Sequence, residues 1–172
     1  MGEGGLVADN FQIPIPAQSW VIPSSGGCSR GAVQNRIYLA FDDTAVEGAH
    51  SPQLQLPAAY TGSGTLKADI LYAMASATAN KVDFEVCVEA ITAADAVDTD
   101  SATSYDAVNA GDQTVPATAG YLGKLTITLT NNDSCAAGDM IRLKLERDAD
   151  DGTNDTATGD ARVYCVVLRE EV

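Results

Sequence analysis

The sequence predicts an all-β protein, a single antiparallel β-sandwich that is jelly-roll-like and carries an extended N-terminal arm. Three observations predict this fold class. Apolar and polar residues alternate with a period of two in several segments, no segment has a helical period, and long irregular connections separate the apolar segments. Tight two-residue turns are too few for an up-and-down meander, so two packed sheets with jelly-roll connections are favoured.

The composition is consistent with one domain. A chain of 172 residues that is 45% hydrophobic can bury about 70% of the surface that its unfolded form exposes. No apolar run approaches the roughly 20 residues needed to span a bilayer. The start, MGEGGLVADN, has neither the basic nor the apolar region of a secretory signal. We therefore expect synthesis in the cytoplasm and no membrane partner.

Residues 1–36 are predicted to form the extended arm, and residues 37–172 the sandwich. Prolines at 14, 16 and 23 fix their own φ and remove hydrogen-bond donors, which makes this stretch a poor interior strand. The arm is neutral overall, whereas the whole chain has a net charge of −14. Its apolar side chains pack either on the chain's own barrel or on a partner, and both alternatives stay open. They are Phe11, Ile13, Ile15, Trp20 and Ile22.

The first predicted strands are 36–41 and a short, proline-bounded strand within 52–60. The segment from Leu66 to Ile91 then shows the clearest alternation in the chain. Its even positions are apolar, and its odd positions carry the charges. We interpret it as a central hairpin of two antiparallel strands around a polar turn at 78–80, with one buried face and one solvated face.

Three further strands close the chain, at 121–130, 140–147 and 161–169. The first two alternate cleanly. An eighth strand is expected within either 13–22 or 113–117. The side chains predicted to point into the core from the two alternating strands are Leu125, Ile127, Leu129, Ile141, Leu143 and Leu145.

The acidic residues are concentrated in two loops. Residues 92–112 and 148–160 each contain five aspartates and no lysine or arginine. Such a surface repels a phosphate backbone, which excludes nucleic acid as a partner. Solvated loops that keep the protein soluble are the simplest interpretation.

No catalytic site is predicted. His50 is the sole histidine and no GxSxG-like nucleophile context is present, so a hydrolytic triad cannot be assembled. Asp83 with Glu85 or Glu89 supplies a carboxylate pair of the kind used in glycoside hydrolysis, but so acidic a chain offers such pairs everywhere. We expect no enzyme activity and no cofactor.

No metal site is predicted either. The four cysteines lie far apart without a CxxC motif, which excludes a zinc signature and favours free thiols in a reducing compartment. The segment beginning at Asp148 superficially resembles a calcium-binding EF-hand loop. Its fifth and twelfth positions are Gly152 and Gly159, which lack the required oxygen ligands. A flexible acidic turn is favoured over an adventitious calcium site.

Carbohydrate binding is the second function class, because lectins share the jelly roll. Sugar recognition requires exposed aromatic side chains, and only Tyr105 and Tyr121 lie in or beside a loop. The remaining tyrosines and one phenylalanine fall within predicted strands, where we assign them to core packing. They are Tyr38, Tyr60, Tyr72, Phe84 and Tyr164.

The runs LKADILYAMASAT, VDFEVCVEAI, PATAGYLGKLTITLT, AAGDMIRLKLERDAD and GDARVYCVVLRE together resemble a β-sandwich module of virion proteins of tailed bacteriophages and related prophages. The resemblance covers about residues 37–170. Related modules occur in tail fibres and in head-decoration proteins. Only about 36 residues precede the module, whereas a fibre has a long shaft, so the resemblance favours a capsid decoration or cement protein.

The resemblance implies a non-enzymatic structural protein on the outer capsid surface, made in the cytoplasm of a host bacterium. Its implied partners are the major capsid protein or another virion protein. It also implies a homotrimer, in which a second copy would cover Cys87 on the charged face. We expect capsid attachment through the five apolar side chains of the arm. The alternative is a receptor- or carbohydrate-binding head domain of a tail fibre or spike.

Overall fold

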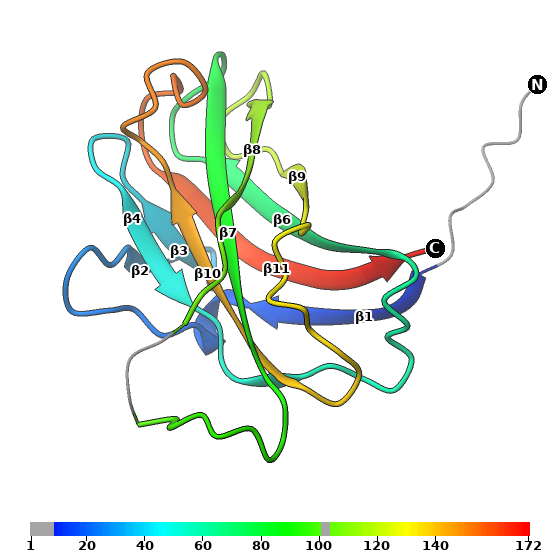
Figure 1. Ribbon diagram of the computed structural model, residues 1–172. Helices are drawn as coiled ribbons and strands as arrows, with labels where there is room; N and C mark the ends of the chain where they lie inside the picture. The colour runs from blue at the N-terminus through cyan, green and yellow to red at the C-terminus, as the bar shows by residue number, and fades with distance from the viewer. Residues whose placement is uncertain (1–8, 101–103) are drawn as a thin grey trace, which may run out of the picture.

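The computed structural model describes residues 9–100 and 104–172, which form two antiparallel sheets packed face to face (Figure 1). One sheet has six strands in the order β2-β3-β11-β6-β9, with β1 also paired to β11. The other has five strands in the order β4-β10-β7-β8, with β5 paired to β10. This confirms the all-β sandwich. The glycine-rich start at 1–8 lies outside the described residues.

The strands are β1 (Asp9–Pro16), β2 (Ser29–Val33), β3 (Arg36–Phe41), β4 (Glu47–His50), β5 (Leu54–Gln55), β6 (Thr65–Met74), β7 (Lys81–Ile91), β8 (Asn109–Thr114), β9 (Gly123–Thr128), β10 (Met140–Arg147) and β11 (Ala161–Glu171). A single 3-10 turn, Ala17–Ser19, is the only helical element in 9–100 and 104–172. None of the helical structure described is long and apolar enough to cross a membrane.

The predicted central hairpin is wrong. β6 pairs with β11 and β9 in the six-stranded sheet, and β7 pairs with β10 and β8 in the five-stranded sheet. Both strands bury their even positions, as predicted, but they do so from opposite sides of the core. The Phe84 ring of β7 lies 5.8 Å from both the Phe41 ring and the Tyr72 ring of the opposite sheet. The segment therefore links the two sheets through the core.

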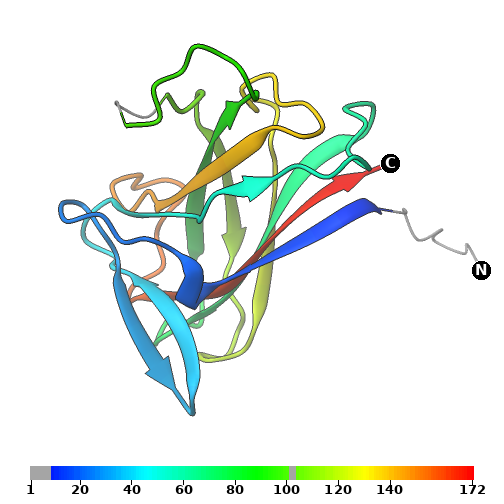
Figure 2. The same cartoon turned by 90° about the horizontal axis from the view of Figure 1, so that it is seen from below.

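The arm is part of the sandwich from residue 9 onward. β1 pairs antiparallel with β11 from Asp9 to Pro16, and the two strands lie side by side in Figures 1 and 2. Ile15 and Trp20 are only 1% and 2% exposed. The three other predicted attachment side chains are partly buried against the same core. Of the two alternatives, the structure therefore displays packing on the chain's own core.

The predicted boundary at residue 36 falls inside a hairpin. β2 pairs with β3, and Gln34 and Asn35 form the two-residue turn between them. Their φ angles are 48° and 63°, the left-handed conformation that a type I′ turn requires at both positions. The hairpin projects from the sandwich in Figure 2. It lies at one end of the six-stranded sheet and borders the outer face of that sheet.

Glu170 connects the two ends of the described chain. Its carboxylate is fully buried and accepts hydrogen bonds from Asn10 Nδ2 at 2.6 Å, the Thr61 amide at 3.0 Å and the Gly64 amide at 3.1 Å. Burial raises the pKa of Glu170, but the hydrogen bonds from Asn10, Thr61 and Gly64 outweigh it and hold the pKa below its usual value. The ionised form therefore stabilises the fold.

We predict that Glu170→Gln lowers the free energy of unfolding at pH 7 by about 1–3 kcal/mol, because an amide NH₂ would face the Thr61 and Gly64 donors. The stabilisation by wild-type Glu170 is fully present above its unfolded pKa of about 4.3. It is lost as the pH falls through the lower folded pKa. Urea unfolding at a series of pH values should therefore show a shallower acid-induced loss in the variant. An exposed control, Asp95→Asn, should keep the wild-type slope, and an unchanged slope in Glu170→Gln would contradict this assignment.

Candidate functional site

A groove with a volume of about 590 Å³ lies on the outer face of the six-stranded sheet. It is bounded by the β2–β3 hairpin and by the loop that precedes β9. Its size falls within the roughly 300–1,000 Å³ of small-molecule sites in proteins. The lining residues are Val33, Gln34, Arg36, Ile37, Leu71, Gly120, Leu122, Arg162 and Tyr164.

A bulge in β11 helps to place two of these side chains. The register of β11 against β6 shifts between Val163 and Cys165, so Tyr164 is the additional residue. Val163 and Val166 on either side of it are buried in the core. Arg162 and Tyr164 are half-buried instead and line the groove.

The ring of Tyr38 supports both side chains. Its centroid lies 6.0 Å from that of Tyr164 in an edge-to-face arrangement, and the Arg162 guanidinium lies 5.1 Å from the Tyr38 centroid. Tyr38 itself lies across Gly31 of β2, where a Cβ atom would come within 2.6 Å of the ring. These contacts hold the floor of the groove in place before any ligand binds.

The assignment of Tyr38 and Tyr164 to the core is therefore wrong. Leu39 and Phe41 of β3 belong to the core cluster, which leaves Tyr38 on the opposite face by simple alternation. Tyr60, Tyr72 and the phenylalanine at 84 are buried, as predicted.

The groove differs in charge from the rest of the chain. Two arginines, Arg36 and Arg162, line it, and none of its lining residues is acidic, although the net charge of the chain is −14. Within 9–100 and 104–172, neither guanidinium forms an ion pair or a hydrogen bond. Tyr121, one of the two aromatic residues expected to be available to a ligand, is 66% exposed, and its neighbour Leu122 in the groove is 64% exposed.

Tyr105, the other aromatic residue expected to be available, lies on the outer face of the five-stranded sheet. Its hydroxyl is 2.8 Å from His50 Nδ1, and its ring is 5.6 Å from the Arg142 guanidinium and 6.0 Å from Lys144 Nζ. Burial raises the pKa of Tyr105 to about 12. Cys87 on the same face is only 3% exposed within a single chain, so its burial does not require a second copy.

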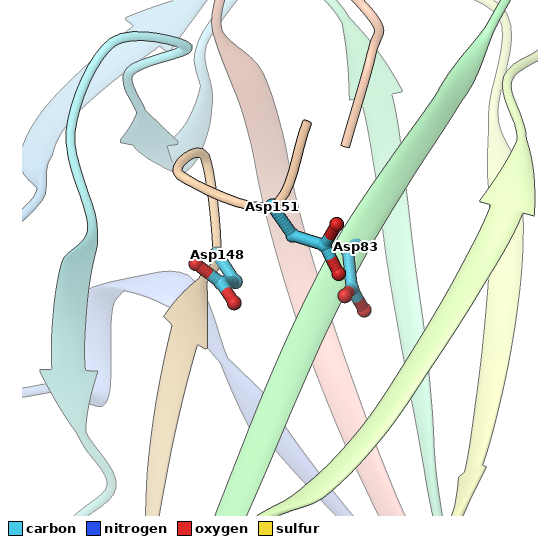
Figure 3. A group of neighbouring side chains, drawn as sticks. All are labelled: Asp83, Asp148 and Asp151. Carbon is cyan, nitrogen blue, oxygen red and sulfur yellow. The ribbon is translucent and has the colours of Figure 1, made fainter. Parts of the chain in front are cut away.

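Three aspartates form an acidic group at one end of the five-stranded sheet (Figure 3). Asp83 lies on β7, and Asp148 and Asp151 lie in the loop after β10. One carboxylate oxygen from each lies within 4.8 Å of the others. Glu89, proposed as a possible partner of Asp83, is instead ion-paired to Arg142 at 2.5 Å. No carboxylate pair between these two residues is formed.

The four cysteines are free thiols. Cys28, Cys87 and Cys135 are buried, and Cys165 is partly exposed. Burial raises the pKa of each, to about 12 in Cys28. Burial therefore disfavours the thiolate form of each cysteine.

No protein-family model matches the chain, and none of the curated proteins searched matches its sequence. Solved structures with the same fold do match. The C-terminal CBM6 of LamC, a laminarinase from Zobellia galactanivorans, has a TM-score of 0.50 at 13% identity, over 92% of this chain and 99% of that one. The arabinose-bound MgGH51 α-L-arabinofuranosidase has a TM-score of 0.50 at 11% identity, over 98% of this chain and 27% of that one.

A third match is the xylohexaose complex of the CBM22-1 and GH10 modules of Clostridium thermocellum xylanase 10B. Its TM-score is 0.50 at 12% identity, over 97% of this chain and 29% of that one. At these identities the similarity shows a shared jelly-roll sandwich. The matched structures are carbohydrate-binding modules or longer chains of carbohydrate-active enzymes.

Proposed function

We propose that this chain is a non-catalytic carbohydrate-binding domain that holds its ligand in the groove on the six-stranded sheet. The observation that carries the proposal is the combination of an aromatic ring, Tyr164, with two unpaired arginines in one preformed groove. Sugar rings present apolar C–H faces that pack on aromatic side chains and hydroxyl groups that accept hydrogen bonds from guanidinium groups. The shared fold with carbohydrate-binding modules supports the proposal.

The charge of the groove favours an acidic saccharide. Arg36 and Arg162 can each donate two parallel hydrogen bonds to a carboxylate or sulfate group, which a neutral sugar cannot match. The remainder of the surface carries the acidic loops and repels an anionic polymer. An acidic glycan is therefore directed to this groove, whose two arginines have no ion pair among the described residues.

We predict that Tyr164→Ala and Arg162→Ala each lower glycan affinity by about 10-fold to 100-fold. The first variant removes a surface on which a sugar ring packs, and the second removes a charged hydrogen bond worth about 1.5–3 kcal/mol. A glycan array with neutral and acidic saccharides would identify the ligand, and calorimetry with the best ligand would measure the variants. Lys124→Ala is the matched control, because Lys124 lies on the same sheet outside the groove. An array without hits, or equal losses in the control, would contradict the proposal.

Placement on a virion, contact with a major capsid protein and the homotrimer stay predictions from the sequence resemblance. A carbohydrate-binding groove is compatible with a receptor-binding head domain, which was the alternative function. Light scattering tests the trimer directly, since a trimer has three times the chain mass of 17.8 kDa. Attachment through Ile15 or Trp20 would require these side chains to leave the core of the chain, because both are buried.

A further inference from the structure

Asp83 is a buried carboxylate with an unsatisfied oxygen. The residue is only 4% exposed, and its Oδ1 atom is the one buried side-chain oxygen or nitrogen in the described residues that has no hydrogen-bond partner. Leaving a buried charged oxygen without a partner is costly, and native proteins almost always avoid it. The position therefore indicates a ligand that supplies the missing contact.

Two further carboxylates lie beside Asp83. Asp148 and Asp151 are partly exposed, and one oxygen from each lies within 4.8 Å of the other and of an Asp83 oxygen. Figure 3 shows the Asp151 carboxylate next to that of Asp83, with Asp148 on the same side of the sheet. None of the three carboxylates forms an ion pair within the described part of the chain. Three negative charges are thus brought together without a protein cation.

The backbone around the three aspartates is fixed by hydrogen bonds. The Asp83 amide donates to Asp155 Oδ2 at 3.1 Å, and the Asp148 amide donates to the Asp83 carbonyl at 3.3 Å. The amides of Thr153 and Asn154 donate to Asp151 Oδ1 at 2.8 and 3.1 Å. The loop is therefore anchored to β7, and the Asp151 carboxylate is held in a defined orientation.

We propose that Asp83, Asp148 and Asp151 bind one calcium ion. Carboxylate oxygens are the ligands of hard divalent cations, and calcium binds them at about 2.3–2.6 Å in flexible geometries. Ligands on opposite sides of a calcium ion therefore lie about 4.6–5.2 Å apart, which accommodates the spacing of these oxygens. Magnesium demands near-ideal octahedral geometry and usually keeps several waters, so a group of three carboxylates from one strand and one loop suits calcium better.

The electrostatics are consistent with this site. Burial, followed by the carboxylates of Glu85, Asp148 and Asp151, raises the pKa of Asp83 to about 6. A divalent cation would neutralise the group and supply a partner for Asp83 Oδ1. The aspartate-rich loop by itself lacks two oxygen ligands of an EF-hand, but the fold adds Asp83 from a distant strand. The proposed site is thus different in kind from the loop site considered in the sequence.

Calorimetric titration of the calcium-depleted full chain with CaCl₂ tests the proposal. We expect one calcium ion per chain and a rise in the melting temperature of about 5–10 °C when free calcium is about 100 times Kd. Asp151→Asn and Asp148→Asn should each weaken calcium binding by more than about tenfold, because each removes a charged ligand. Magnesium at equal ionic strength should give a smaller rise.

Asp150→Asn is the matched control. Asp150 lies in the same loop and is exposed, and it is not part of the acidic group. The control should bind calcium like the wild type. If Asp150→Asn and Asp151→Asn lose the same calcium affinity, the effect comes from the net charge of the loop and not from a specific ligand, which would overturn the proposal. Weak extracellular modules bind calcium with a Kd of up to about 1 mM. If the wild type binds no calcium at about 10 mM, ten times that value, the proposal is also overturned.

Asp83→Asn separates calcium binding from folding. Without calcium, this variant should fold and melt no lower than the wild type, because it removes a charge from a repulsive group. It should nevertheless lose the calcium-dependent rise in melting temperature. A retained rise would show that Asp83 is not a ligand and would overturn the proposed site.

Discussion

Replacing Arg147 with methionine is expected to lower the free energy of unfolding by about 3–5 kcal/mol, since it leaves a buried carboxylate without its partner. Arg147 is completely buried. Its Nε and Nη2 atoms donate to the two oxygens of Asp155, both at 2.8 Å. Its remaining donors reach the carbonyls of Phe41, Ala157 and Gly159 at 3.2, 2.6 and 2.9 Å. One side chain thus joins β10, β3 and the second acidic loop.

Urea unfolding followed by circular dichroism measures this effect. Lys81→Met is the control, because Lys81 forms a more exposed ion pair, with Asp112 at 2.7 Å. Its loss should be about 0–1 kcal/mol. The double variant Arg147→Met with Asp155→Leu should recover part of the stability, since no buried charge then lacks a partner. If the Arg147 and Lys81 variants lose equal stability, the buried pair does not have the assigned role.

The burial of Arg147 and of Glu170 could be predicted from the sequence, although the groups that pair with them could not. In β10 the inward series Ile141, Leu143 and Leu145 continues to Arg147 by simple alternation. In β11 the inward series that ends at Leu168 continues to Glu170. Period two thus predicts that each strand ends its buried face with a charged residue. The groups that satisfy these charges come from loops whose positions alternation does not determine.

Strand pairing was the main feature that the sequence could not predict. Alternation shows which face of a strand is buried, but two strands facing each other across a core have the same pattern as two strands in one sheet. The segment containing β6 and β7 was therefore assigned to a hairpin. The burial of Asp83 and Glu89 was missed for a related reason. The loop after β10 lies beside Asp83, and the Ser104 amide and the Arg142 side chain contact Glu89, whereas alternation predicts that this face is solvated.

The groove was only partly predictable. Alternation places Tyr38 outside the core, but the two-residue turn at Gln34 and Asn35 lacks the Asn-Gly or Asp-Gly signature of a type I′ hairpin. The β11 bulge at Tyr164 leaves no signal in the sequence. The groove also requires that β3, β11 and the loop before β9 become neighbours, which depends on the order of strands in the sheet.

Trp20→Ala is expected to lower the free energy of unfolding by about 3–5 kcal/mol, the usual loss for a buried tryptophan. The Trp20 side chain is 2% exposed, and its Nε1 atom donates to the Ile15 carbonyl at 3.3 Å. Its backbone carbonyl accepts a hydrogen bond from Arg30 Nη2 at 2.5 Å. Removing the indole would leave a cavity where β1, the 3-10 turn and β3 meet. Chemical unfolding of the full chain measures the loss.

Val21→Ala is the control for this prediction, because Val21 is the next residue and is 60% exposed. Its loss should stay within about 0.5 kcal/mol. Deleting residues 1–24 should destabilise the fold further, since it removes Ile15 and Trp20 from the core and uncovers the edge of β11 that β1 occupies. The hypothesis of capsid attachment through the arm predicts instead that this deletion leaves a folded domain that no longer binds its particle, and that Trp20→Ala weakens that binding. Unfolding and binding measurements on the same variant therefore distinguish a core strand from a docking arm.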